Sequence, residues 1–215
     1  MRVLIINPNT TAAMTVHVAA QLGLHLKAGT QILQRTAAQG ASVIATQQAF
    51  DTGAQTACAV LSQAVDEGLV FDKVLLACFG DPGLEAMRTI TSAPIIGLAQ
   101  ACMQVAKQMN KPYAVVTAGA AWEAILLQRF RQWGQSDLFK GVQVISGTGL
   151  DVFKNPLAAL PSVQRTIEAA SSAGAEQIVL GGAVFAGYKA VMQASGIDTQ
   201  GLLDCVECAA EVLMQ

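Results

Sequence analysis

The sequence has few charged residues, few aromatic residues and almost no histidine. Charged side chains make up 13% of its 215 residues, aromatic side chains make up 5%, and there are two histidines. The 13 lysines and arginines are scattered along the chain, which argues against a basic patch for nucleic acid or for an anionic membrane. Because so little charge is available to cover the surface, we expect part of it to be buried in a homo-oligomer.

The sequence also lacks a motif for a nucleotide or metal cofactor. The glycines of 181–187 match neither the dinucleotide-binding nor the phosphate-loop spacing. Cys205 and Cys208 form a C-x-x-C pair without a partner pair, within a helical pattern, which favours helix packing over metal or redox use. His17 and His25 are too far apart to form an i, i+4 ligand pair. We therefore expect no cofactor, no metal and a small molecule as the partner.

Long apolar runs and a disulfide framework are missing as well. The first apolar run, Val3–Ile6, ends in a turn at Asn7–Pro8 and is too short for a signal-peptide core or a membrane span. The five cysteines are odd in number and lack the spacing of a disulfide scaffold. These features predict a cytoplasmic protein with reduced thiols and no membrane partner.

What the sequence does contain is a regular alternation of short apolar runs and longer segments of helical period. Apolar residues make up 53% of the chain, and β-branched residues are concentrated in the short runs. Apolar strands joined by helices are typical of a parallel sheet covered on both faces, with ligands bound beyond the carboxyl ends of the strands. The sequence therefore predicts an α/β fold. Its strands are expected near 2–6, 30–35, 73–77, 94–97, 113–117, 142–146 and 177–181.

A faint internal repeat relates the two parts of the chain. Val74–Gly80 aligns with Ile178–Val184, and in this alignment Cys78 matches Gly182. The repeat predicts two half-domains, each about a hundred residues long, that face each other across a cleft. Chance similarity between two strand–helix units would give the same pattern.

The boundary between the half-domains is expected after Pro94 and Ile95–Gly97, because a new helix begins near residue 100. A last helix, predicted over 201–214, has an apolar stripe that is expected to return to the first half-domain. The predicted half-domains are 1–98 plus 199–215, and 99–198.

Cys78 is the residue best placed for chemistry. It follows an apolar strand, Lys73–Ala77, at the carboxyl end where ligands bind. Asp81 is predicted to be an N-cap and Pro82 the first residue of a helix, whose amide groups would then face the thiol and lower its pKa. Burial would raise that pKa, and a buried structural cysteine is the alternative interpretation.

Two polar segments also follow strands. Asn7–Thr11 brings amides, hydroxyls and helix-initial N–H groups to the same sheet edge as Cys78, where they suit an anion or a carbonyl. Capping by Thr10 or Thr11 is the alternative, and it does not exclude binding. Asp51 or Thr52 is predicted to cap the next helix, with a role in substrate binding as the alternative.

Four motifs at the ends of strands together resemble those of the aspartate/glutamate/hydantoin racemase family, most closely its hydantoin and allantoin racemase branch. They are Ile5–Thr10, Ala77–Leu84, Val115–Thr117 and Ala175–Gly181. The resemblance implies two αβα half-domains related by a pseudo-twofold axis, with a cofactor-free active site between them. It also implies two opposed cysteines, one removing a proton from the stereocentre of the substrate and the other returning one from the opposite face.

The resemblance assigns roles to individual residues. Cys78 matches the first catalytic cysteine, and the N–H groups of Phe79 and Gly80 are expected to hold the developing enolate oxygen. The expected substrate-binding residues are Asn9, Thr10, Phe79, Gly80, Thr117, Gly182 and Ala183. The implied activity is that of a cofactor-independent isomerase, acting next to a carbonyl of a cyclic ureide or a small carboxylate.

The chain departs from the family pattern at the second cysteine, where it has Gly182. Three outcomes are open: a racemase with a substitute acid such as Tyr188, an enzyme that works on one face only, or a binding protein that has lost the reaction. One-faced chemistry would be similar to that of arylmalonate decarboxylases or maleate isomerases. Tyr188 would be a poor base at neutral pH, since the unperturbed pKa of tyrosine is about 10.

Overall fold

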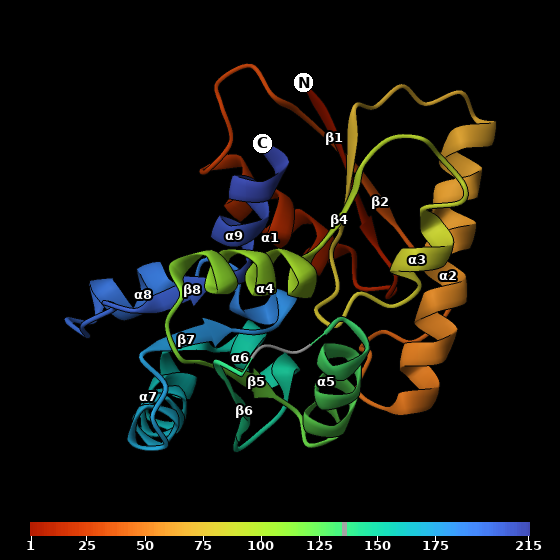
Figure 1. The fold of residues 1–215 in the computed structure, drawn as a ribbon. Coiled ribbons are helices and arrows are strands. Elements are labelled where there is room, and N and C mark those ends of the chain that lie inside the picture. The colour runs from red at the N-terminus through yellow and green to blue at the C-terminus, as the bar shows by residue number, and fades with distance from the viewer. Residues whose placement is uncertain (135–136) are drawn as a thin grey trace.

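The computed structural model describes residues 1–134 and 137–215, which form two four-stranded parallel sheets (Figure 1). The first sheet has the order β2-β1-β3-β4 and the second the order β6-β5-β7-β8. The strands of the first are β1 (Arg2–Asn7), β2 (Gln31–Thr36), β3 (Lys73–Leu76) and β4 (Ile95–Gly97). Those of the second are β5 (Tyr113–Ala118), β6 (Phe139–Ile145), β7 (Gln177–Leu180) and β8 (Leu202–Asp204). The predicted α/β class is confirmed, and each predicted strand overlaps an observed one.

The two sheets repeat the same strand order, so β1, β2, β3 and β4 correspond to β5, β6, β7 and β8. The segments aligned in the sequence are therefore equivalent strands, β3 and β7, which lie next to the central strand of each sheet. Cys78 and Gly182 each lie two positions beyond the end of their strand, at Leu76 and Leu180. The repeat is thus structural, and the two positions are equivalent.

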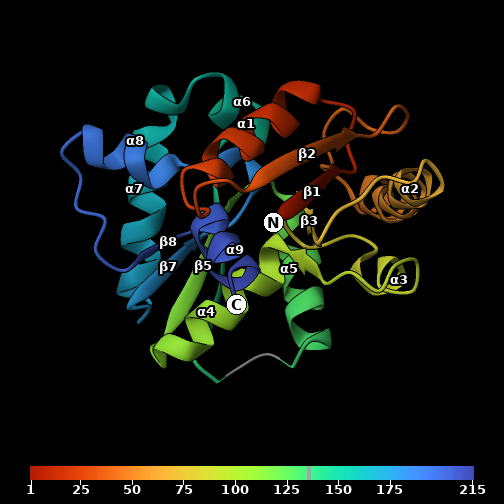
Figure 2. The same ribbon diagram turned by 90° about the horizontal axis from the view of Figure 1, so that it is seen from above.

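Helices cover both sheets and fill the space between them. They are α1 (Ala12–Gly23), α2 (Gln47–Asp66), α3 (Leu84–Met87), α4 (Leu98–Met109), α5 (Ala121–Gln132), α6 (Gly149–Lys154), α7 (Pro156–Ser172), α8 (Tyr188–Ala194) and α9 (Cys205–Leu213). A short 3-10 helix spans Ala183–Phe185. Viewed from above, α2 and α3 lie at one side of the molecule, α7 and α8 at the other, and α9 in the middle (Figure 2).

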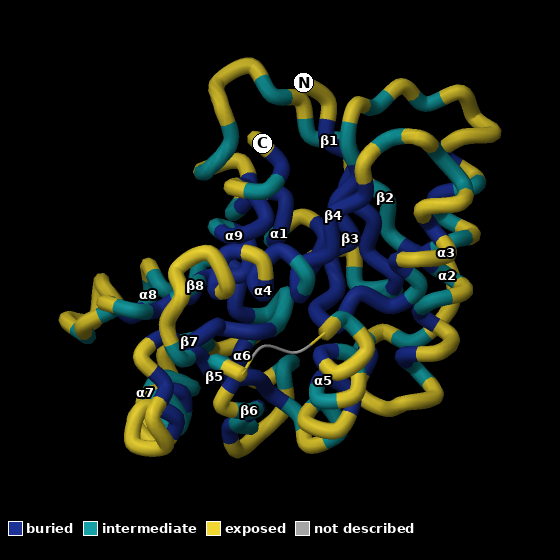
Figure 3. Tube along the Cα trace, viewed as in Figure 1, coloured by how far each residue is buried: buried dark blue, intermediate teal, exposed yellow. Residues whose placement is uncertain are grey.

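The largest hydrophobic core joins the two sheets. It combines buried residues of β1 and β5 with the inner faces of α1, α4, α5 and α9. Two further clusters lie on the outer faces, one between the first sheet and α2, and one between the second sheet and α7 and α8. The buried stretches of the chain therefore follow the strands and the central helices (Figure 3). This shared core fixes the two sheet edges that build the site.

The carboxyl-terminal segment differs from its prediction. Residues 202–204 form β8, which pairs with β7 of the second sheet, and the helix begins only at Cys205. The short run Leu202–Leu203 fits the helical stripe equally well, so the pattern alone could not separate strand from helix. The predicted assignment of 199–215 to the first half-domain is therefore wrong for β8. Helix α9 lies between the sheets, against α1 and α4.

The second helix begins earlier than predicted. Thr46 is the N-cap of α2, and its side chain accepts a hydrogen bond from the Ala49 N–H (3.1 Å). Asp51 and Thr52 lie inside the helix, where Asp51 accepts a hydrogen bond from Gln47 Nε2 (2.8 Å). The predicted capping role of Asp51 or Thr52 is therefore wrong.

None of the helices in the two described ranges has the length and apolarity needed to cross a bilayer.

Candidate active site

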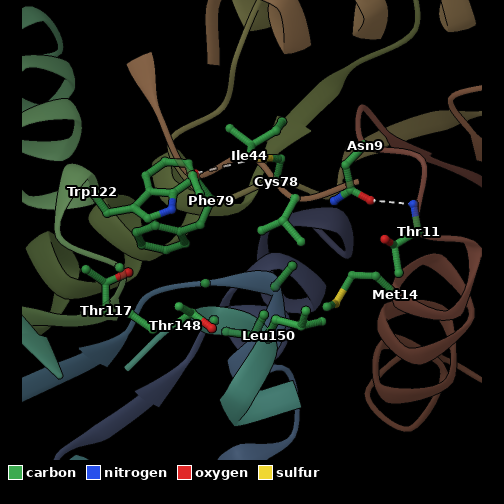
Figure 4. Close-up of a pocket in the computed structure, with 18 of the residues that line it drawn as sticks. Asn9, Thr11, Met14, Ile44, Cys78, Phe79, Thr117, Trp122, Thr148 and Leu150 are labelled. Carbon is green, nitrogen blue, oxygen red and sulfur yellow. Dashed lines mark hydrogen bonds between the residues drawn. The ribbon is translucent and has the colours of Figure 1, made fainter. Parts of the chain in front are cut away.

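A cavity of about 450 Å³ opens between the carboxyl edges of the two sheets, a volume within the usual range for small-molecule sites. Both halves of the repeat line it (Figure 4). The first half contributes Asn9, Thr11, Met14, Ser42–Ala45 and Ala77–Phe79. The second contributes Thr117–Trp122, Thr148–Leu150 and Gly182–Val184. None of these residues is charged, so the cavity suits a neutral ligand with polar edges.

Most of the site residues expected from the sequence meet at this cavity. They are Asn9, Cys78, Phe79, Thr117, Gly182 and Ala183. Thr10 and Gly80 lie outside its lining. The Thr10 N–H donates to the Ala41 carbonyl oxygen (3.0 Å), and Gly80 packs under Trp122, where an added Cβ would lie 2.8 Å from Cζ3 of the indole. The expected contacts of Thr10 and Gly80 with a ligand are therefore not supported by their positions.

The Cys78 thiol is in an apolar environment. Its side chain belongs to a buried cluster with Ile44, Phe50 and Ile125, and the residue is 6% exposed. Burial raises the pKa of Cys78 far above its usual value, and the charge of nearby Asp81 adds to this effect. In the free protein the group is therefore a neutral thiol. The prediction of a lowered pKa is wrong.

The predicted helix beside Cys78 is shorter and begins later. Helix α3 starts at Leu84, its N-cap is Gly83, and it has four residues. Asp81 therefore does not cap it. Instead the Asp81 carboxylate accepts hydrogen bonds from the N–H groups of Ala99 (3.1 Å) and Gln100 (2.8 Å), at the start of α4. The carboxylate stabilises the beginning of helix α4, which starts seventeen residues further along the chain, at Leu98.

Asp81 is held in an unusual setting. The residue is fully buried and has a φ of 55°, a left-handed conformation that aspartate tolerates better than most residues. Gly97 is required beside it, because a Cβ at that position would overlap the Asp81 carboxyl group. Burial raises the pKa of Asp81 to about 7, although the bonds from Gln100 and Ala99 favour the charged form.

This raised pKa predicts that stability depends on pH through Asp81. The folded protein holds the Asp81 proton up to a pH of about 7, whereas the usual carboxyl value is 3.8. The resulting stabilisation is fully present below the unfolded value and is lost as pH rises towards 7. We expect the free energy of unfolding of the wild type to fall relative to Asp81→Asn between pH 4 and 7, by a few kcal/mol at most, on the order of 1.4 kcal/mol per pKa unit.

The measurement is urea denaturation of both proteins at several pH values. Asp51→Asn is the control, because it makes the same substitution at an exposed residue of α2. If the difference in free energy of unfolding between wild type and Asp81→Asn stayed constant from pH 4 to 7, the raised pKa of Asp81 would be contradicted.

The corner after β1 is fixed by side-chain amides. The buried Asn7 side chain donates from Nδ2 to Asn9 Oδ1 and to Thr15 Oγ1, both at 3.0 Å. Asn9 Oδ1 also accepts from the Thr11 N–H (2.9 Å), which leaves Nδ2 of Asn9 without an acceptor among the described residues. In Figure 4 this nitrogen lies on the Cys78 side of Asn9. The corner therefore presents a free N–H donor to the cavity.

The hydrogen bonds of Thr10 and Thr11 show whether these residues cap helix α1 with their side chains. Thr11 occupies the N-cap position of α1, but its side chain makes no cap bond, and its hydroxyl donates to the Ser42 carbonyl oxygen (2.7 Å). Thr10 is held through its backbone. Neither hydroxyl caps the helix, so the alternative of side-chain capping is wrong. The Thr11 hydroxyl instead ties the corner to the loop that carries Ser42–Ala45.

The opposite wall belongs to the second sheet. Thr117 is at the end of β5, and its hydroxyl has no partner among the described residues. Thr148 Oγ1 donates to Asp151 Oδ2 (2.7 Å) within a capping box at the start of α6. Trp122 packs edge-on against Phe50, with ring centroids 6.0 Å apart. Within the described residues, no group of three or more His, Cys, Asp and Glu is arranged to hold a metal ion.

Comparison with known proteins agrees with this geometry. The profile of the Asp/Glu/Hydantoin racemase family matches residues 3–213. The chain belongs to this family. A hydantoin racemase from Paenarthrobacter aurescens is 29% identical over 215 residues, which cover 99% of this chain and 89% of the relative. A hydantoin racemase from Rhizobium meliloti is 30% identical over 186 residues, covering 84% and 75%.

The similarity extends to solved structures. Allantoin racemase from Klebsiella pneumoniae superposes with a TM-score of 0.87 and 27% identity, over 100% of this chain and 86% of that one. The resemblance to the hydantoin and allantoin branch of the Asp/Glu/hydantoin racemase family is thereby confirmed. The two sheets with their flanking helices are the fold of that group.

Tyr188 does not replace the second cysteine that the family pattern leads us to expect. Its ring is buried in the outer cluster of the second sheet, away from the cavity lining. The hydroxyl donates to the Pro156 carbonyl oxygen (2.8 Å), and burial raises the pKa of Tyr188 to about 12. The thiol nearest to Gly182 is that of Cys205, which donates to the Gly182 carbonyl oxygen (3.3 Å) but is fully buried and does not line the cavity.

Several lining residues were missed by the sequence analysis. They are Thr11, Met14, Ser42–Ala45, Trp122 and Thr148–Leu150. The loops that carry most of them follow β2, β5 and β6, so the rule that ligands bind at the carboxyl ends of parallel strands also applies to them.

Proposed function

We propose that this protein is a cofactor-independent enzyme of the racemase type that exchanges a proton at a carbon next to a carbonyl group, with Cys78 as the acid and base. The substrate class proposed is a neutral cyclic ureide of the hydantoin or allantoin type. The named relatives are hydantoin racemases and an allantoin racemase. The absence of charged residues in the cavity lining favours a neutral ring over a small dicarboxylate.

The observation that carries the proposal is the position of the Cys78 thiol in the same cavity as the free Nδ2 donor of Asn9. Removal of a proton next to a carbonyl places negative charge on the carbonyl oxygen, and an N–H donor aimed at that oxygen stabilises the enolate. The Cys78 sulfur would take the proton and give it back. Because the free thiol is neutral, its own proton has to pass to solvent water before the sulfur can take the proton of the substrate, and the S–H bond formed in that step then returns a proton to the same carbon.

A second candidate follows from Gly182. The equivalent position to Cys78 has no side chain, and among the described residues that line the cavity no second thiol is present. An enzyme with one thiol would remove and return the proton on the same face. This observation favours exchange with retention of configuration over rapid racemisation.

The test is deuterium exchange at C5 of a single enantiomer of hydantoin derivatives and of allantoin, followed by NMR in D₂O. We expect exchange above the protein-free rate, with retention of configuration. Chiral chromatography of the same samples measures racemisation. A folded protein that accelerates exchange on none of these compounds would contradict the proposed reaction, and tight binding without exchange would point to a binding protein.

A further inference from the structure

The loop that carries the thiol, residues 78–81, is held by the other half of the molecule. Phe79 lies against Gly181, the residue that follows β7, since a Cβ on Gly181 would lie 2.7 Å from the Phe79 ring and 2.6 Å from Val115 Cγ1. On the next residue, Trp122 of α5 covers Gly80. The thiol-bearing loop belongs to the first sheet by sequence, but its residues Phe79 and Gly80 pack against the second half of the molecule.

Arg129 makes the polar part of this contact. From α5 its Nε donates to the Gly80 carbonyl oxygen (3.1 Å) and its Nη2 donates to the Asp81 carbonyl oxygen (3.3 Å). The guanidinium is itself oriented, because it lies 4.5 Å above the Trp133 ring and donates from Nη1 to Gln132 Oε1 (2.9 Å). A planar fork of donors held in this way fixes the direction of the two carbonyl groups.

The loop conformation requires such support. Gly80 and Asp81 both have positive φ values, 100° and 55°, and sparsely populated conformations persist only where the surroundings determine them. The Ala99 and Gln100 amides at the start of α4 hold the Asp81 side chain, and Arg129 of α5 holds the backbone. The turn that contains Phe79 and Gly80 is closed by a hydrogen bond from the Asp81 N–H to the Cys78 carbonyl oxygen (3.1 Å).

We infer that Arg129 is a positioning residue, which sets the orientation of the Cys78 thiol in the cavity by holding the Gly80 and Asp81 carbonyl groups from the opposite half of the molecule. This inference rests on the proposed function. Arg129 does not line the cavity, so it acts on the reaction only through the loop.

The kinetic test compares Arg129→Gln with Arg129→Lys. For Arg129→Gln we expect kcat for C5 exchange to fall by about 10- to 100-fold, the effect expected of a misplaced reacting group, with little change in KM. Arg129→Lys, which keeps the charge and one donor, should recover part of the loss. Arg131→Gln is the matched control, because Arg131 is an exposed residue on the same helix.

A second measurement does not depend on catalysis. Amide hydrogen exchange in the ligand-free protein should accelerate at residues 79–81 in Arg129→Gln and remain at the wild-type rate in Arg131→Gln. Equal kinetics and equal amide exchange in the two variants would overturn the inference. A wild type without C5 exchange would instead contradict the proposed reaction, while the amide exchange would still decide whether Arg129 holds the loop.

Discussion

Replacement of Cys78 by serine should lower the rate of C5 exchange by about 10²- to 10⁴-fold, the usual contribution of a well-placed acid or base. A serine hydroxyl has nearly the same size, so the apolar cluster with Ile44, Phe50 and Ile125 should remain packed. In the same buried position a hydroxyl is a much weaker acid than a thiol, so serine is the poorer acid and base. The measurement is deuterium incorporation by NMR, with the protein-free rate subtracted.

Cys58→Ser is the matched control. That thiol lies on α2, is partly exposed, and is directed at the Gly83 carbonyl oxygen (4.0 Å) rather than at the cavity. We expect the control to exchange at the wild-type rate. If Cys78→Ser kept most of the activity, or if both variants lost it to the same extent, Cys78 would not be the acid and base of the reaction.

The strands were predictable because their signal is local. Runs such as Val3–Ile6 are apolar on both sides, which is typical of parallel strands buried on both faces. Strand β8 was missed because three residues are too few to separate a strand from the helix that follows. The sequence repeat alone was weak evidence for two half-domains. Because the two sheets have the same strand order, Cys78 and Gly182 occupy equivalent positions in the structure.

The chemistry of the site was less predictable because it depends on residues distant in sequence. The local pattern at Asp81–Pro82 predicted an N-cap for the helix that follows directly. In the structure, the Asp81 carboxylate instead accepts hydrogen bonds from the N–H groups of Ala99 and Gln100. The apolar setting of the thiol is built by three further segments, which carry Ile44, Phe50 and Ile125. Composition and spacing locate a strand-end cysteine, but they do not show which side chains will desolvate it.

Gly182→Cys should turn exchange with retention into racemisation. Two-base racemisation needs a proton donor on each face of the substrate, and the new thiol would occupy the position equivalent to Cys78. The increase in the racemisation rate should be at the lower end of the usual 10²- to 10⁴-fold range for an added acid or base. The reason is strain: Gly182 has φ 156° and ψ 140°, a conformation that other residues rarely adopt. Chiral chromatography of a single enantiomer during the reaction measures the effect.

The size of this rate increase depends on the space around the new side chain at position 182. A Cβ at position 182 would lie 3.3 Å from Phe185 Cδ2 and 3.4 Å from Val184 Cγ2, so the backbone or the Phe185 ring has to move by a few tenths of an ångström. Gly182→Ala imposes the same backbone change without a thiol and should not racemise the substrate. A folded Gly182→Cys variant that racemises no faster than Gly182→Ala would mean that the two equivalent positions do not face one stereocentre from opposite sides, even though the strands that carry them correspond.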